Sequence, residues 1–300
     1  MLDYMNLKLT GRFCATGDSM LTAWVTDNRD SRHIRYDQGL VDGLGIDVQK
    51  LPELVSSTQV FKKSSVRNHM AAVPSAISGR YLALAMQTAA GANLSFLRDR
   101  IIYHPDELLS DEQHPDVYEL LDRIASRVPA GARGLIYMPW LCGERSPVDD
   151  PSLRAGLFNL KLEHSREDII RAFLEGIALN TRWMLEPFGR FLGRSDEAIT
   201  AVGGGAQSDL WCQIMADITG HRIHQPDHPI QTNARGSAFI AAVGLGALTF
   251  DDIAGLQRPH RTYEPSRHLK GLYDDRFATF QEVQKRLAPL YRRLNPAENN

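Results

Sequence analysis

One segment of this 300-residue chain constrains its fold more than any other: a strand, a run of glycines and a helix in direct succession. Apolar residues from Ala198 to Val202 predict a buried strand, and Gly203-Gly204-Gly205 follow at once. A helical apolar spacing comes next and stops at Gly220; its residues are Leu210, Trp211, Ile214, Met215 and Ile218. A strand that turns through glycines into a helix is typical of α/β proteins.

The glycine run has two interpretations. Glycines let the phosphates or ribose of a ligand approach the backbone, and a helix N-terminus favours negative charge. The same glycines also permit mere close packing of strand and helix, so both interpretations stay open. The segment is not a dinucleotide fingerprint, because Ser208 stands where a glycine is needed, and the chain contains no P-loop motif. Asp209 would repel a phosphate beside it, and suits a hydroxyl or the helix dipole.

Strand and helix patterns alternate over the last two thirds of the chain, which predicts an α/β layer architecture. Ser165 is the expected N-cap of a long helix, answered by Asp168, and Pro187 with Gly189 is expected to end that helix. The weakest pattern lies between Val60 and Ala72, where we expect a loop or a poorly ordered joint. The remaining expected elements are a strand over 81–86, a helix over 117–128, a strand over 134–139 and a solvent-facing amphipathic helix over 273–294.

Composition excludes several classes of protein. Hydrophobic residues make up 43% of the chain and charged residues 23%, within the ordinary globular range. A formal net charge of −2 supplies no positive field for nucleic acid and no basic block for a membrane surface. The start of the chain shows no targeting segment, and the three cysteines are too scattered for a disulfide framework. We therefore expect a cytoplasmic protein that binds neither nucleic acid nor membrane.

Two further segments carry residue types that serve in binding sites. The small-residue turn Ala89–Asn93 permits either the approach of a ligand or compact packing against a neighbouring helix. The loop from Met138 to Pro147 is either a binding loop or a structural cluster of Glu144 and Arg145. Cys142 in that loop has no evident base nearby, so we expect no nucleophilic thiol.

No metal site is expected. His221, His224 and His228 are spread over a strand and a proline-containing loop rather than one helix face, and the zinc motif H-E-x-x-H does not occur. The nucleophile elbow G-x-S-x-G is also missing from the sequence, so the sequence does not indicate a serine hydrolase.

Several ordered motifs together resemble the FGGY carbohydrate kinases, in particular their xylulokinase-like members. Gly203 to Trp211 with Ala216 to Gly220 resembles the adenosine motif of that family. Asn159 and Phe173 depart from the family pattern, which prefers Gly and a smaller residue there. The other similar segments are 3–13 (the end of the first domain), 90–92 and 97–99 (a turn before L-R-D), 140–147 (L-x-G-E-R-[ST]-P), 155–176 and 233–246.

The resemblance implies an actin-like ATPase (ribonuclease H-like) fold of the α/β class. Residues 76–300 would form the C-terminal nucleotide-binding domain with its terminal helix, largely retained. Residues 1–75 would be a remnant of the N-terminal domain plus a shortened joint. The implied cofactor is ATP with Mg²⁺, and the implied substrate is a small sugar or polyol. Gly91, Gly204, Gly205 and Asp209 match positions that contact ATP in the family.

The resemblance supplies no catalytic residue and no metal ligand. The family places its catalytic Asp and a second phosphate loop where this chain has only Phe61 to Pro74, an interval without Asp, Glu or Gly. No segment matches the N-terminal phosphate loop, and Asp3, Asp18 and Asp27 do not match the catalytic motif. The chain is therefore expected to be either a sugar kinase or a truncated, inactive relative that at most binds adenine nucleotide. If early strands of the actin-like sheet that the resemblance implies are missing, unpaired strand edges predict self-association. The expected partners are therefore a second copy of the chain, in a homo-oligomer, or a complementing fragment.

Overall fold

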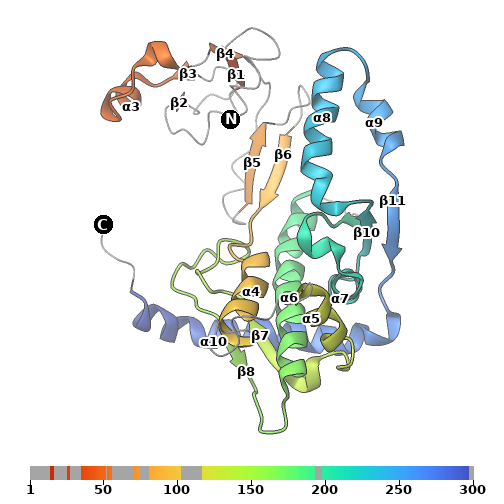
Figure 1. Ribbon diagram of the computed structural model, residues 1–300. Coiled ribbons are helices and arrows are strands. Elements are labelled where there is room, and N and C mark those ends of the chain that lie inside the picture. Colours follow the sequence, from red (N-terminus) through yellow and green to blue (C-terminus); the bar gives the residue numbers. More distant parts are fainter. Residues whose placement is uncertain are drawn as a thin grey trace, which may run out of the picture. The chain divides into compact units, whose positions relative to one another are not determined.

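The computed structural model describes residues 14–16, 26–27, 35–51, 53–55, 70–74, 81–102, 117–192 and 198–296. The chain divides into two compact units, Met1–Leu84 and Ala85–Asn300. Figure 1 traces the elements of both units along the sequence.

Among its described residues, the first unit contains short paired strands and the helix α3. β1 pairs with β4 in parallel, β2 pairs with β3 antiparallel, and β5 pairs with β6. The bounds are β1 Cys14–Thr16, β2 Thr26–Asp27, β3 Arg35–Tyr36, α3 Gln38–Gly43, β4 Glu53–Val55, β5 Met70–Pro74 and β6 Tyr81–Ala85. The loop expected over 60–72 is wrong for its last residues, because backbone pairing with β6 makes Met70–Pro74 a strand; residues 60–69 lie outside the described part.

The second unit alternates helices with short strands. β7 pairs with β8 antiparallel, and a three-stranded sheet has the order β11-β10-β9. The bounds of its first half are α4 Gly91–Phe96, α5 Val117–Ala125, β7 Ile136–Met138, β8 Gly156–Phe158 and α6 Arg166–Leu192. Those of its second half are β9 Ala198–Thr200, α7 Asp209–Thr219, β10 Arg222–Pro226, α8 Thr232–Gly244, α9 Phe250–Leu256, β11 Pro259–Tyr263 and α10 Lys270–Leu294. The strands expected near residues 81, 134 and 198 and the helix expected from 117 are confirmed.

The main hydrophobic core forms around α6. This helix contacts β7, α7, α5 and α4, and Figure 1 shows these elements grouped along it. Ile170, Phe173 and Ile177 are each at most 1% exposed on its inner face. Phe173 stacks on Tyr137 of β7 with ring centroids 3.5 Å apart. The helix therefore serves as the central support of this unit.

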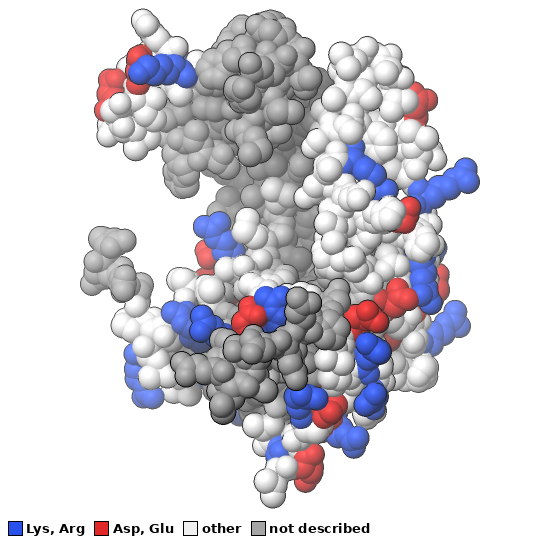
Figure 2. Space-filling model, viewed as in Figure 1, with Lys and Arg blue, Asp and Glu red and all other residues white. Residues whose placement is uncertain are grey.

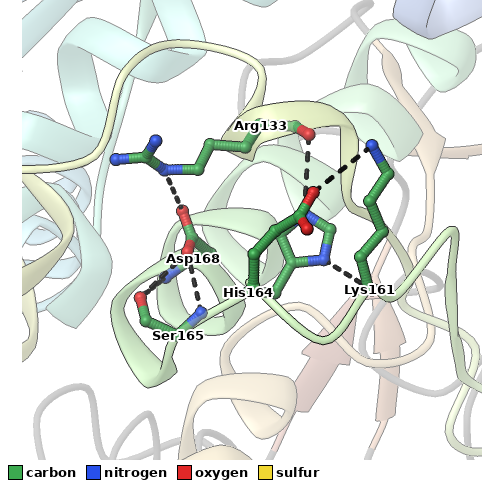
Figure 3. Close-up of polar contacts among 6 residues, drawn as sticks. Arg133, Lys161, His164, Ser165 and Asp168 are labelled. Carbon is green, nitrogen blue, oxygen red and sulfur yellow. Dashed lines mark hydrogen bonds and ion pairs between the residues drawn. The ribbon is translucent and has the colours of Figure 1, made fainter.

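The start of α6 is fixed by a reciprocal cap, as the sequence predicts. The Ser165 N–H donates to Asp168 Oδ2 at 2.8 Å, and the Asp168 N–H lies 3.4 Å from Ser165 Oγ. Figure 3 shows Arg133 completing the cluster, with its Nε 3.1 Å from Asp168 Oδ1. In the same view, His164 accepts the Lys161 N–H at Nδ1. The cluster ties the helix start to the turn that precedes β7.

The expected end of α6 at Pro187 and Gly189 is wrong. Pro187 lies buried inside the helix, which continues to Leu192. A proline removes one backbone hydrogen bond, and tertiary packing can offset that cost. The last helix ends at Leu294 as expected but begins at Lys270, before the expected start. It is not simply solvent-facing, because its apolar stripe is buried in the main core, with Tyr273 and Phe280 at 1% and 0% exposed.

Charges on the visible surface are mixed. Figure 2 shows Lys and Arg side chains interspersed with Asp and Glu over the described residues of that face. Across the described part of the chain, no helix combines the length and the apolar character needed to cross a membrane.

Candidate functional site

The glycine turn, residues 203–208, joins β9 to α7. Gly203 has φ 88° and ψ −172°, a conformation that favours glycine, and Gly204–Gln207 form one 3-10 turn. Ser208 then caps α7, because its Oγ accepts the Trp211 N–H at 2.9 Å. Gly220, with φ 73°, ends α7 by donating to the Ala216 carbonyl. The predicted succession of strand, glycine turn and helix is thus confirmed, with the helix stop at the expected residue.

A cavity of about 600 Å³ opens against the glycine turn. The turn contributes Gly204 and Gly205, and α4 contributes Gly91 at its first position. The structure therefore brings together three of the four residues that the sequence singled out, from two turns far apart along the chain. Their role toward a ligand remains a prediction.

A second part of the lining is apolar and belongs to the main core. We call this the packed wall: Leu94 of α4, Leu121 of α5, and Ile170 and Leu174 of α6, each at most 8% exposed. Polar groups are added by Ser95, Tyr118, Glu119 and Asp122. An apolar cavity of this size with a few polar groups at its margin has the character of a small-molecule site.

The glycines at the cavity differ in the space around them. A Cβ on Gly205 would lie 2.0 Å from Trp211 Cζ3, so this position has no room for a side chain. A Cβ on Gly204 or Gly91 would meet nothing within 4 Å, although both residues line the cavity. The two interpretations of the glycine run therefore apply to different residues: Gly205 permits packing, and Gly204 leaves space in the cavity.

Asp209 lies directly after the glycine turn, at the first position of α7. It is not among the residues that line the cavity. Its Oδ1 accepts the Tyr263 hydroxyl at 2.6 Å, and its carboxylate pairs with Arg261. Sequence reasoning missed Tyr263 and Arg261, and no local signal could have found them, since Tyr263 lies 54 residues further along the chain. A contact between Asp209 and a ligand remains a prediction.

In the loop from Met138 to Pro147, the buried Glu144 holds neighbouring segments together by hydrogen bonds. Glu144 is 3% exposed and accepts the Thr88 N–H at 2.8 Å and the Asn180 Nδ2–H at 2.7 Å. Arg145 donates its backbone N–H to Glu144 Oε1 at 2.9 Å. The expected pairing of the Glu144 and Arg145 side chains is therefore wrong, because Glu144 bonds to Thr88 and Asn180. The carboxylate instead ties the turn before α4 to α6.

His221 and His228 contact residues that are close to them in the sequence. His221 Nδ1 lies 2.9 Å from the Thr219 carbonyl oxygen, and His228 Nε2 lies 3.7 Å from Asp227 Oδ2. Within the described ranges, no group of three or more His, Cys, Asp or Glu residues is arranged to hold a metal ion. Burial raises the pKa of Cys212 to about 12, so this thiol stays protonated at neutral pH.

Comparison with known proteins decides the family. The model of the FGGY family of carbohydrate kinases, C-terminal domain, matches residues 53–245. This chain belongs to the FGGY carbohydrate kinases. Members of the family are ATP-dependent carbohydrate kinases, and the match includes the glycine turn and both faces of the cavity.

Curated relatives carry different substrate names. The xylulose kinase of Staphylococcus epidermidis is 26% identical over 249 residues, which are 82% of this chain and 45% of the relative. The gluconokinase of Bacillus licheniformis is 34% identical over 155 residues, which are 50% of this chain and 30% of the relative. The chain thus spans less than half the length of these FGGY relatives.

A solved structure supports the fold. The xylulose kinase of Lactobacillus acidophilus superimposes with a TM-score of 0.73 at 21% identity, over 97% of this chain and 68% of that one. This chain accordingly has the actin-like ATPase fold of the FGGY kinases, and its structure covers the region of their C-terminal domain. The predicted family and fold class are confirmed.

Proposed function

We propose that the second unit, Ala85–Asn300, binds the adenosine part of ATP for phosphoryl transfer to a sugar or polyol. One observation carries this proposal: Gly91, Gly204 and Gly205, which the family resemblance assigns to the nucleotide, line a single cavity of about 600 Å³. The packed wall offers apolar surface to a purine base, and the glycine turn offers backbone that a ribose or phosphate can approach closely.

The residues present fit a nucleotide. The open space at Gly204 is a cradle that a Cβ would occupy, and Ser95 and Tyr118 supply hydroxyl groups at the same cavity. Bound ATP supplies the phosphoryl group. Mg²⁺ takes many of its ligands from phosphates and water, so in this proposal the ion enters with the nucleotide.

Calorimetric titration of the full chain with ATP and ADP tests the binding site. We expect binding, and we expect Gly204→Ala to weaken it by roughly tenfold, because a methyl group would occupy the cradle. Gly236→Ala on α8 is the matched control: it adds the same methyl in open space outside the cavity. Absence of heat at millimolar nucleotide, or equal affinity in both variants, would contradict the proposed site.

A second candidate function is nucleotide binding without turnover. It is favoured by the interval Phe61 to Pro74, which contains no Asp, Glu or Gly where the family has its catalytic Asp and a phosphate loop. Loss of even one group that stabilises developing charge typically costs about 10²–10³ in rate. An ADP-release assay with xylulose, gluconate and glycerol distinguishes the candidates: steady turnover by this chain would refute the inactive one.

Location and partners follow from the same proposal. A kinase that draws on ATP and free sugars would work in the cytoplasm. If the chain lacks turnover alone, the missing groups would come from a complementing fragment or a second copy, and turnover restored on mixing would support that arrangement.

A further inference from the structure

We propose that Tyr263 and Gln225 are positioning residues of the nucleotide cavity, which fix the glycine turn from its outer side through Ala206 and Asp209. The binding part of this inference depends on the proposed function. The structural part concerns the turn itself and can be tested without a ligand.

The glycine turn presents two different sides. Gly204, Gly205, Gln207 and Ser208 line the cavity, but Ala206 does not. Ala206 is 5% exposed, and its carbonyl oxygen accepts the Gln225 Nε2–H at 2.7 Å. The middle of the turn is thus bonded to β10, on the side away from the cavity.

Tyr263 of β11 completes this outer support. Its hydroxyl donates to Asp209 Oδ1 at 2.6 Å and lies 3.1 Å from Gln225 Oε1. Tyr263 is 5% exposed and Gln225 is 6% exposed, so water competes little for the bond between these two side chains. The Asp209 side chain is 58% exposed, so its carboxylate also meets solvent. The Arg261 guanidinium pairs with the same carboxylate. One connected network therefore joins β10, β11, the turn and the start of α7.

Few other bonds fix the middle of the turn: Ser208 acts on α7 through its Oγ, and the Gly203 N–H donates to the Pro229 carbonyl at 3.0 Å. Gly204 and Gly205 have no side chains, and within the turn the Ala206 N–H reaches the Gly203 carbonyl at 3.2 Å. Hydrogen bonds to a charged carboxylate are the stronger ones available to fix such a segment. We therefore assign Asp209 to the support of the turn, in place of contact with the nucleotide.

Tyr263→Phe tests the assignment by removing one hydroxyl and keeping the ring. We expect backbone amide exchange at Ala206 and Ser208 to become about tenfold faster, and the ATP dissociation constant to rise about tenfold, in keeping with the loss of a hydrogen bond to a charged group. Exchange is measured on the ligand-free chain, so it decides the inference even if wild type binds no nucleotide.

Tyr273→Phe is the matched control. Its hydroxyl is also buried and donates to a carboxylate, Glu175 Oε1 at 2.9 Å, but in the main core. We expect this variant to lower the melting temperature while leaving turn exchange and ATP affinity unchanged. Equal exchange at Ala206 and Ser208 in the two variants would overturn the inference. If wild type shows no binding, the proposed function fails separately.

A double-mutant cycle separates support from direct contact. If Asp209 acts through Tyr263, Asp209→Ala and the double variant Asp209→Ala/Tyr263→Phe should have the same ATP affinity within about twofold. Additive losses would mean that Asp209 and Tyr263 act independently, and would overturn the assignment.

Discussion

The two sides of the cavity are held by different forces. The packed wall consists of apolar side chains that belong to the main core around α6. The glycine turn rests on a small cluster of Cys212, Ala216, Ile223 and Tyr263, and on the polar network of Asp209 and Gln225. One side is therefore fixed by burial in the main core, and the other by a smaller apolar cluster together with a few hydrogen bonds.

This difference separates stability from binding. Burying a large apolar side chain contributes about 1.5–3 kcal/mol, and many such residues meet in the main core. A single net hydrogen bond contributes about 0.5–1.5 kcal/mol. Changes in the packed wall should therefore act mainly on folding of the unit, whereas changes behind the glycine turn should act mainly on the shape of the cavity.

The largest expected effect comes from Phe173→Ala, which breaks the support of the packed wall. Phe173 is 1% exposed and stacks on Tyr137, so its removal leaves a cavity in the core. We expect a loss of about 3–5 kcal/mol in the free energy of unfolding, measured by urea denaturation. Leu162→Ala at a fully exposed position is the control and should change little. A loss below about 1 kcal/mol for Phe173→Ala would contradict the comparison.

A smaller, pH-dependent effect is expected from Asp168→Asn at the start of α6. Burial raises the pKa of Asp168, but hydrogen bonds from Ser165 and the charge of Arg133 outweigh it, so the pKa lies below its usual value. A lowered folded-state pKa stabilises the protein above the unfolded pKa of about 4. This stability is lost as the pH falls through the folded pKa.

Asp168→Asn should therefore cost about 1–2 kcal/mol at pH 7, and less near pH 3. Thermal unfolding across this pH range measures the difference. Asp275→Asn, at an exposed position on α10, is the control and should change stability little. A deficit that is the same at both pH values would show that the charge of Asp168 does not support the helix start.

The sequence predicted what depends on neighbouring residues. The Ser165–Asp168 cap, the glycine turn and the stop at Gly220 are local patterns, and all three are found in the structure. It failed at Pro187, where tertiary packing overrides a local preference, and at Glu144, whose partners Thr88 and Asn180 come from distant segments. The partners of Asp209, Arg261 and Tyr263, come from β11, which no local pattern connects to it.

Hydrogen exchange of the full chain with and without ATP tests the central claim most directly. If ATP binds in the cavity between the packed wall and the glycine turn, amide exchange should slow in both residues 91–95 and residues 203–208. Exchange in α8 should not change. Unchanged exchange in those two segments at saturating ATP, or protection confined to other parts of the chain, would contradict the account.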